Sequence, residues 1–548
     1  MRVAKRPGSR VLRLVNQVSP AEYAWLVAAV LLSLALRVPF FKVAMIADEG
    51  GYAYATRGWL DGTGQLYGDL WISRPQGIFL VYAAIFKTLG TGTVAFRLAA
   101  WIACVLTTLV VWAIARRWLS PRGAIYAAMC FAFFSSLPNI EGFTANAEIF
   151  MGLPSAMCAW LLLHAHSRNW PRWSLVTIGI LAGVATQLKP SGLVMLLVAF
   201  VFLLLVEPQP LRLYLQRCGW ILAGLAMIGI PSLIHGYFLG WNDFFYATIA
   251  YRITSQSSAT VPLFHHIFRI SALVYRCYGL TAALIVMLIL RYRFPLQQGY
   301  QKWSTWLRSR LVLSRSGVVL HAVAGPSAVH YLSRPTDTTG FLLRIWGIGC
   351  LLGISMGGDW WAHYLIQIAA PFSIWFARAS VEIWRGLWRW DRLVYTLVVT
   401  GLLVTPYWVL FAGNHDARSI TQALFGHAGY PAQEQIARYL REHTEPGDTI
   451  YVAFDQAAIY YLADRKPAYK HLYDQELLAL PDSYSDILSI IQSPNRPKYI
   501  VTTRQTGPFP DDGRAFWQMV SKYYDFETDI NGVPLLRVKD DPPPPETG

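Results

Sequence analysis

The stretch VAAVLLSLALRVPFFKVAMIADEGG, residues 27–51, leads from an apolar segment directly into the acidic pair Asp48-Glu49. The apolar segment, followed through Ile46, is long enough to cross a bilayer. The preceding segment, Met1–Arg13, carries five Lys/Arg residues and no acid, and such basic segments stay on the cytoplasmic side. The sequence therefore predicts that Asp48 and Glu49 emerge at the outer membrane surface. Carboxylates at that depth are costly, which favours a functional role for them.

The composition of the whole chain is that of a polytopic membrane protein. Of its 548 residues, 14% are charged and 54% are hydrophobic, whereas soluble domains carry about 25% charged residues. The formal net charge is +15, but the basic residues cluster between apolar spans, for example at Arg116-Arg117 and over 385–392. The positive-inside bias explains these clusters better than nucleic-acid binding does, so we expect no nucleic-acid partner. No cleavable signal peptide is evident, and we interpret the first span as an anchor.

Hydropathy predicts about 11–13 transmembrane helices, and basic loops placed inside define their direction. The eleven clear crossings lie at about 22–45, 94–115, 122–138, 149–166, 174–188, 191–206, 219–239, 267–290, 338–357, 364–380 and 392–412. The apolar segment 77–90 is too short for a crossing and is expected to lie against the outer leaflet, within a long first outer loop over 46–93. The weakly apolar segment 317–331 leaves open a half-span within 316–337.

The chain becomes polar after the last span, which predicts three parts: a transmembrane domain over 1–412, a soluble outer domain over 413–540 and a disordered tail over 541–548. The soluble part alternates between helical and strand patterns. Helices are expected at 433–442, 457–462 and 513–524, and strands at 449–454, 498–503 and 533–538. This pattern is typical of a small α/β domain. No internal repeat is evident, which argues against transporters built from duplicated halves.

Acidic and cationic residues gather in the predicted outer loops. The acids are Asp48, Glu49, Glu141 and Glu148, and the cations and their polar partners are Arg57, Arg74, Lys189, Arg252, His265, His266, His363 and Tyr364. Cations at one interface suit a phosphate-bearing amphiphile, and a carboxylate beside them can accept a proton from a nucleophile.

Structural explanations remain open for several of these residues. Asp48 fits a solvated helix boundary, Glu148 fits a helix N-terminal cap, and Pro190 after Lys189 fits a helix terminator. The adjacent histidines 265–266 point in different directions, so a loop role is favoured over metal binding. His363-Tyr364 fits interfacial anchoring.

The order of short motifs along the chain resembles the GT-C membrane glycosyltransferases. The first outer loop holds Asp48-Glu49-x-x-Tyr52, Trp59-Leu60-x-Gly62, Tyr67-x-Asp69 and Arg74-Pro75. Later landmarks are Phe96-Arg97-Leu98, Asn146-Ala147-Glu148, Gln187-Leu188-Lys189-Pro190, His363-Tyr364-Leu365, Tyr460-Tyr461-Leu462-Ala463 and Pro497-Lys498-Tyr499-Ile500. The resemblance is to the branch that holds the lipid A aminoarabinose transferases, the rhizobial galacturonosyltransferases and the protein O-mannosyltransferases.

This resemblance implies an inverting hexosyl- or pentosyltransferase. The enzyme would move a sugar from a polyprenyl-phosphate donor to a glycan, glycolipid or protein acceptor, at the outer (periplasmic) face of the bacterial inner membrane. Asp48 would be the principal catalytic carboxylate, with Glu49 beside it and Glu148 at a second acidic position. Arg74 would hold the carrier phosphate. Further donor or substrate contacts would come from Lys189, Arg252, His363, Tyr364, Tyr52 and Arg57. Gln76 and Pro190 depart from the family pattern, which bears on the donor rather than on the reaction class.

No metal or other cofactor is expected to be required, because no nucleotide diphosphate leaves and fixed cations can neutralise the departing phosphate. A divalent ion at Asp48 and Glu49 stays open. A secondary transporter or flippase is the alternative function, but transporters place their ionisable groups at the membrane midplane. An O-antigen polymerase or ligase is a third possibility, and it is distinguished by a large central outer loop. In this chain the longest polar outer region is C-terminal.

Overall fold

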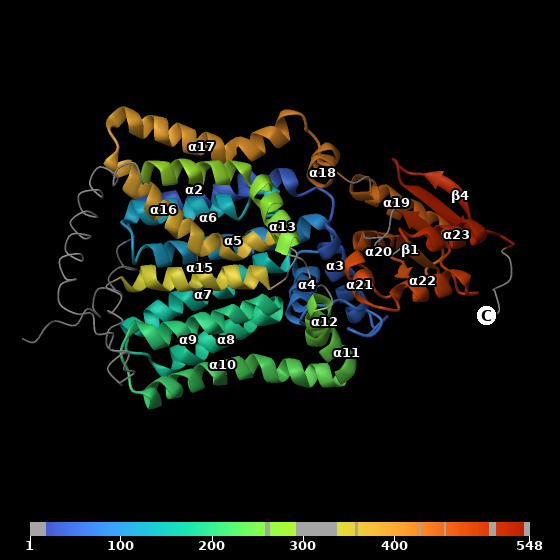
Figure 1. Cartoon of the computed structure of the whole chain (residues 1–548), viewed down its shortest axis with the longest axis horizontal. Helices are drawn as coiled ribbons and strands as arrows, with labels where there is room; N and C mark the ends of the chain where they lie inside the picture. Colours follow the sequence, from blue (N-terminus) through green and yellow to red (C-terminus); the bar gives the residue numbers. More distant parts are fainter. Residues whose placement is uncertain are drawn as a thin grey trace, which may run out of the picture.

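The computed structural model describes residues 18–257, 263–291, 337–356, 360–426, 429–453, 456–503 and 511–541. A bundle of helices forms one part of the molecule, and a smaller α/β domain sits at one end of it (Figure 1). The segment 317–331 and the tail 542–548, for which a half-span and disorder were expected, lie outside the described residues.

The bundle consists of helices that run roughly along one direction (Figure 1). They are α2 (Pro20–Arg37), α5 (Thr93–Ala115), α6 (Pro121–Phe134), α7 (Ala147–Ser167), α8 (Arg172–Leu188), α9 (Val194–Val206), α10 (Leu211–Phe238), α15 (Thr338–Ser355), α16 (Ala369–Gly386) and α17 (Arg389–Ala412). Short 3₁₀ turns extend or join them: η1 (Val38–Phe40), η2 (Pro138–Ile140), η3 (Pro190–Leu193) and η7 (Ala362–Ile368).

Six helices in the described ranges are long and apolar enough to cross a membrane, or seven if one bent pair counts as a single span. The six are α2 with η1, α5, α7, α10, α15 and α17. The expected crossings at 174–188 and 191–206 coincide with the shorter apolar helices α8 and η3–α9. Close packing holds these elements together. A Cβ atom on Gly179 of α8 would lie 1.9 Å from the carbonyl oxygen of Ile221 on α10, so only glycine permits this approach.

The segment 267–290, expected to form one crossing, is not one continuous helix. Helix α13 (Leu263–Arg276) and the following helix, Tyr278–Arg291, are bent by 87° relative to each other. Contacts of the polar side chains of α13 explain the break: Trp360 donates a hydrogen bond to His266, Arg269 lies over the ring of Trp361, and Arg276 pairs with Glu141. These contacts hold α13 across the end of the bundle (Figure 1).

Several further helices lie at the end of the bundle that faces the α/β domain (Figure 1). They are α3 (Ala47–Leu60), α4 (Gly77–Thr88), α11 (Trp241–Phe245), the π-helical turn η4 (Tyr246–Ala250), α12 (Tyr251–Ser257) and α18 (Ala417–Phe425). Helix α4 has only 12 residues and packs on α3, α5 and α8. It is therefore too short to span a bilayer.

The C-terminal domain is a five-stranded sheet with helices on both faces. Its strands are β1 (Thr449–Ala453), β2 (Lys466–Pro467), β3 (Tyr499–Thr502), β4 (Tyr524–Asp529) and β5 (Pro534–Val538), in the order β2-β1-β3-β5-β4. Strand β1 is parallel to β2 and β3, and β5 is antiparallel to β3 and β4. Its helices are α19 (Gly429–His443), α20 (Ala457–Ala463), α21 (Asp474–Ala479), α22 (Ser483–Gln492) and α23 (Arg514–Tyr523).

The side chains of β1 point alternately to the two faces of the sheet, which explains why helices cover both faces. Ile450 and Val452 enter the core beneath α19 and α20, whereas Tyr451 and Ala453 enter the core beneath α22 and α23. The six helices and strands expected from sequence in this region are confirmed, apart from shifts of a few residues at their ends. Strands β2 and β4 and helices α21 and α22 were not anticipated.

Candidate active site

Asp48 lies in the first turn of α3, at the end of the bundle that faces the C-terminal domain (Figure 1). One of its oxygens accepts a hydrogen bond from Asn146 Nδ2 at 3.2 Å, and the other lies 3.6 Å from Arg74 Nη2. The Asp48 side chain keeps 20% of its surface exposed. Asp48 is thus an oriented carboxylate that a substrate can still reach.

Arg74 is held in a fixed position beside Asp48. Its Nε donates to Tyr52 Oη at 2.8 Å, and its Nη1 donates to the carbonyl of Ser73 at 3.0 Å. Arg252 on α12 donates to the same Ser73 carbonyl at 2.8 Å and to the Ser73 hydroxyl at 2.9 Å. Two guanidinium groups therefore converge on one backbone turn, and Tyr52 supports the first of them. Such a pair of fixed cations suits an anionic ligand.

A second charged cluster is built from α7, the end of α8, and η7. Lys189 Nζ contacts a carboxylate oxygen of Glu148 and lies 3.6 Å from the centre of the Tyr364 ring. His363 Nδ1 is 3.1 Å from Glu141, and its Nε2 is 3.8 Å from Glu148. Burial lowers the pKa of His363, but the carboxylates of Glu148 and Glu141 outweigh burial and raise it above the ordinary value. His363 thus interacts with both acids.

The two clusters interact with each other. Arg74 interacts electrostatically with Asp48 and also with Tyr364 and Glu148 of the second cluster. The structure therefore brings together the following residues that the sequence singled out: Asp48, Tyr52, Arg74, Glu148, Lys189, Arg252, His363 and Tyr364. What they form is a carboxylate flanked by cations at one end of the bundle.

Glu49 does not share this environment, although it adjoins Asp48 in sequence. Its side chain has no exposed surface. One oxygen pairs with Arg97 Nη2 at 2.7 Å and accepts the backbone N–H of Ile46, while the other accepts the backbone N–H of Ala145 at 2.6 Å. Both oxygens are thus engaged within the protein. The geometry gives Glu49 the role of a positioning residue rather than a catalytic one.

Arg57 also lies away from Asp48, so its assignment as a substrate contact is corrected. It lies about two and a half helical turns after Asp48, near the other end of α3. There it donates to the carbonyl of Tyr461 at 2.7 Å and pairs with Asp464 at 3.1 Å. Its guanidinium also covers the Tyr461 ring. Arg57 therefore joins α3 to α20 of the C-terminal domain.

Two residues of the C-terminal domain belong to the site and were missed from the sequence. Glu476 on α21 is buried and interacts electrostatically with Arg74 and Asp48, and Tyr473, which precedes α21, interacts with Asp48 and Tyr52. No local pattern around residue 476 marks this role. The sequence feature that could have indicated a contact here is the pair Gly50-Gly51 next to Asp48. Adjacent glycines in a helix indicate that another segment approaches closely.

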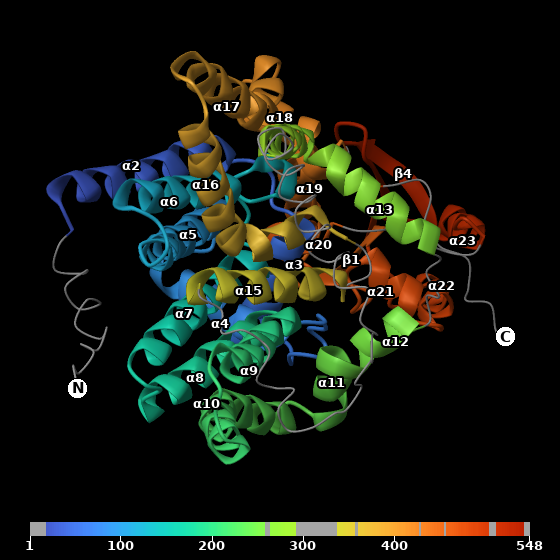
Figure 2. The ribbon, with the colours of Figure 1, turned by 60° about the vertical axis from the view of Figure 1, so that its left-hand side comes forward.

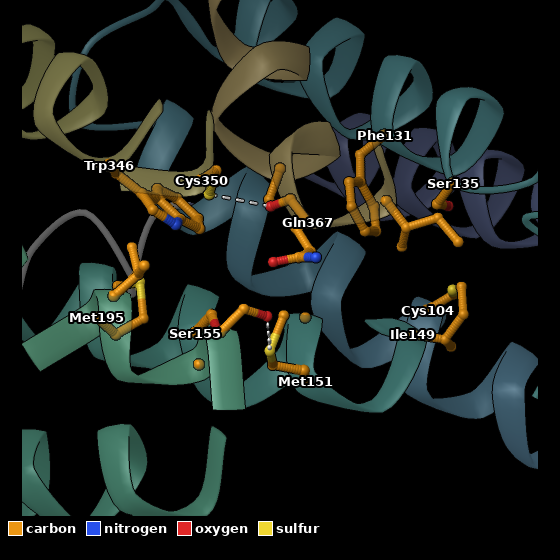
Figure 3. Close-up of a pocket in the computed structure, with 16 residues that line it drawn as sticks. Cys104, Phe131, Ser135, Ile149, Met151, Ser155, Met195, Trp346, Cys350 and Gln367 are labelled. Carbon is orange, nitrogen blue, oxygen red and sulfur yellow. Dashed lines mark hydrogen bonds between the residues drawn. The ribbon is translucent and has the colours of Figure 1, made fainter. Parts of the chain in front are cut away.

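A small cavity lies inside the bundle, lined by residues of α5, α6, α7, α9, α15 and η7 (Figure 3). Its volume is only about 20 Å³, enough for a single water molecule. The Gln367 amide lies at its centre (Figure 3), and within the described residues Gln367 Nε2 and Trp346 Nε1 have no hydrogen-bond partner. A cavity of this size cannot hold a sugar.

Comparison with known proteins places this geometry in a known architecture. The family described as dolichyl-phosphate-mannose-protein mannosyltransferase matches residues 73–235, a range that includes Arg74, Glu148 and Lys189. ArnT from Cupriavidus metallidurans in the apo state superposes with a TM-score of 0.59 at 13% identity, covering 94% of this chain and 98% of that chain. No curated protein matches the chain.

Two further solved structures show the same arrangement. ArnT from Cupriavidus metallidurans bound to undecaprenyl phosphate has a TM-score of 0.54 at 13% identity, with coverage of 94% of this chain and 98% of that chain. The archaeal oligosaccharyltransferase AglB from Archaeoglobus fulgidus, in complex with an inhibitory peptide and a dolichol-phosphate, has a TM-score of 0.51 at 15% identity. It covers 96% of this chain and 75% of that chain. The chain shares the fold of ArnT and AglB. This fold confirms the expected multi-pass helical protein of GT-C type with a C-terminal α/β domain.

Proposed function

We propose that this chain is an integral membrane glycosyltransferase that moves a sugar from a polyprenyl-phosphate donor to a glycan, glycolipid or protein acceptor. The observation that carries the proposal is the reachable carboxylate of Asp48, 3.6 Å from the Arg74 guanidinium in a GT-C fold. ArnT has been crystallised with undecaprenyl phosphate and AglB with a dolichol-phosphate. A lipid-phosphate donor is therefore compatible with this architecture.

The chemistry divides between the two clusters. Arg74, with Arg252 beside it, binds the donor phosphate and stabilises the charge that develops as the sugar–phosphate bond breaks. The acceptor hydroxyl attacks the anomeric carbon, its proton passes to Asp48, and the polyprenyl phosphate leaves. Lys189, positioned by Glu148 and Tyr364, adds positive charge on the opposite side. A single displacement of this kind inverts the anomeric configuration.

The remaining assignments extend the proposal. The transferred group is a hexose or a pentose, the protein lies in a bacterial inner membrane, and the site and the C-terminal domain face the periplasm. The reaction needs no divalent metal: fixed cations already flank Asp48, and both oxygens of Glu49 are engaged by Arg97 and backbone amides. A transporter function is not favoured, because α3 and α12, which carry Asp48 and Arg252, lie at the end of the bundle that faces the C-terminal domain (Figure 1).

The test is a purified assay in which the chain is given polyprenyl-phosphate sugars and candidate acceptors, with and without EDTA. Asp48→Asn keeps the shape and the hydrogen bond from Asn146 but cannot take a proton. We expect transfer to fall about 10²–10⁴-fold, the usual range for lost acid–base catalysis, while donor binding persists. EDTA should have no effect.

Arg74→Ala is the companion variant, with exposed Lys87→Ala as the matched control. Loss of one charge-assisted contact costs about 1.5–3 kcal/mol, so we expect at least a tenfold loss for Arg74→Ala and none for the control. Turnover close to wild type in both Asp48→Asn and Arg74→Ala would refute the proposed site.

A further inference from the structure

The C-terminal domain touches the catalytic helix α3 directly behind Asp48, through the glycine pair at 50–51 (Figure 1, Figure 2). A Cβ atom on Gly50 would lie 2.3 Å from Ala458 Cα, and a Cβ atom on Gly51 would lie 1.8 Å from Tyr473 Oη. Only glycine at both positions allows α20 and Tyr473 to come this close. The domain is therefore seated on the active-site helix itself.

The contact between the C-terminal domain and α3 places two buried polar groups near Asp48. Glu476 is 4% exposed, and its Oε2 has no hydrogen-bond partner among the described residues. Tyr473 Oη is likewise buried and unpartnered within the described ranges. Buried polar atoms in native proteins are normally satisfied, so these two atoms require a partner, either a bound water or a polar group of a ligand.

The charged groups around Glu476 define what that ligand must be. Arg74 and Asp48 both interact with it electrostatically, and backbone N–H groups of Leu472 and Tyr473 hydrogen-bond to its carboxyl. Burial outweighs these effects and holds the pKa of Glu476 well above its ordinary value. Burial thus favours the protonated form of Glu476, which can both donate and accept a hydrogen bond.

We propose that Glu476 and Tyr473 form a hydroxyl-binding subsite of the C-terminal domain, which holds the sugar that is transferred. This inference rests on the proposed function. During transfer the sugar must lie between the donor phosphate at Arg74 and the acceptor at Asp48, and Glu476 interacts with both of these residues. A neutral carboxyl and a phenol match the neutral hydroxyls of a sugar. They match a phosphate poorly, since its charge is better met by Arg74.

The experiment compares binding of two lipids to the purified full-length protein: undecaprenyl phosphate alone, and undecaprenyl phosphate carrying glucose, mannose or arabinose. The variants are Glu476→Leu, which removes the polar group at similar volume, Glu476→Gln, which keeps an uncharged hydrogen-bonding group, and Tyr473→Phe. Exposed Glu434→Gln is the matched control. Binding is followed by the ligand-dependent shift in melting temperature.

For the wild type we expect at least one sugar-bearing lipid to bind more tightly than the bare lipid. Glu476→Leu should weaken binding of that lipid at least tenfold, Tyr473→Phe about threefold or more, and Glu476→Gln less than Glu476→Leu. None of the variants should change binding of bare undecaprenyl phosphate. If Glu476 had only a structural role, its replacement would weaken the binding of both lipids equally. This result would overturn the inference. Equal wild-type affinity for all the lipids would also overturn it.

Failure of this inference is distinguishable from failure of the proposed function. If sugar-dependent binding is lost in Glu476→Leu but no acceptor is glycosylated, the subsite stands and the transferase function does not. If transfer occurs and Glu476→Leu keeps the wild-type preference for the sugar-bearing lipid, the function stands and the subsite does not. If Glu476→Leu fails to fold, the same comparison of the two lipids with Tyr473→Phe tests the subsite.

Discussion

At the residue scale, Asp48 and Glu49 show how strongly two neighbouring carboxylates can differ. One helical residue step turns a side chain by about 100°, so consecutive residues point to different surroundings. Asp48 faces Arg74 and retains exposure, whereas Glu49 points into the bundle and meets Arg97. The sequence identified the pair, but the rotation about α3 that separates their roles depends on how α3 packs.

Glu49→Gln should therefore act on folding rather than on chemistry. The change leaves Arg97 charged and buried without its partner, and breaking a buried ion pair typically costs about 3–5 kcal/mol. We expect a lower melting temperature and reduced yield, with turnover per folded molecule less affected than in Asp48→Asn. The double variant Glu49→Gln/Arg97→Met removes the orphaned charge and should recover part of the stability. A normal melting temperature with lost turnover would instead make Glu49 catalytic.

The raised pKa of Glu476 predicts a pH-dependent stability at the same scale. Between the ordinary glutamate pKa and the raised one, the folded protein holds a proton that the unfolded chain has released. The free energy of unfolding therefore falls as pH rises through this interval. Glu476→Gln removes the effect, so the melting temperature of this variant, relative to that of the wild type, should rise as pH rises above the ordinary glutamate pKa. A difference that is constant with pH would contradict the assignment.

At the element scale, the contact between α3 and α20 positions the C-terminal domain over the active site. Arg57 and Asp464 pair across this contact, and Tyr461 Oη donates to the carbonyl of Thr91 at 2.7 Å. The elements themselves follow local rules, since α2 begins with a capping box at Ser19 and Glu22. These local rules do not determine which elements contact each other in the folded protein.

Gly50→Ala tests this contact. Its methyl group would meet the backbone of Ala458, which cannot move aside as a flexible side chain could. We expect the domain to separate from α3, with faster protease cleavage between α17 and α19 and at least a tenfold loss of transfer. Gly92→Ala is the control, because no atom lies within 4 Å of its added Cβ. Unchanged protease sensitivity in Gly50→Ala would mean that the domain docks elsewhere.

At the scale of the whole molecule, the charged site and the C-terminal domain lie at the same end of the bundle (Figure 1). The basic loops predict that this end faces outward. All six cysteines are buried, so an impermeant thiol reagent has a low background. In intact cells we expect labelling of Asp61→Cys and Glu442→Cys, both at exposed positions, and protection of the control Arg212→Cys. If Arg212→Cys alone were labelled, the topology would be the inverse of the predicted one.

Properties carried by local sequence could be predicted without coordinates. The lengths of the apolar segments predicted the multi-pass class, and short strand-forming runs, such as the β-branched and aromatic run at 449–454, predicted β1, β3 and β5. The order of the motifs predicted the GT-C architecture and the residues around Asp48. The break near Cys277, the burial of Glu49 and the contribution of Glu476 could not be predicted. Each depends on contacts between residues far apart in sequence: Arg276 with Glu141, Glu49 with Arg97 and Ala145, and Glu476 with Arg74. A side chain's role is set by the dielectric and charges around it, and only packing brings those together.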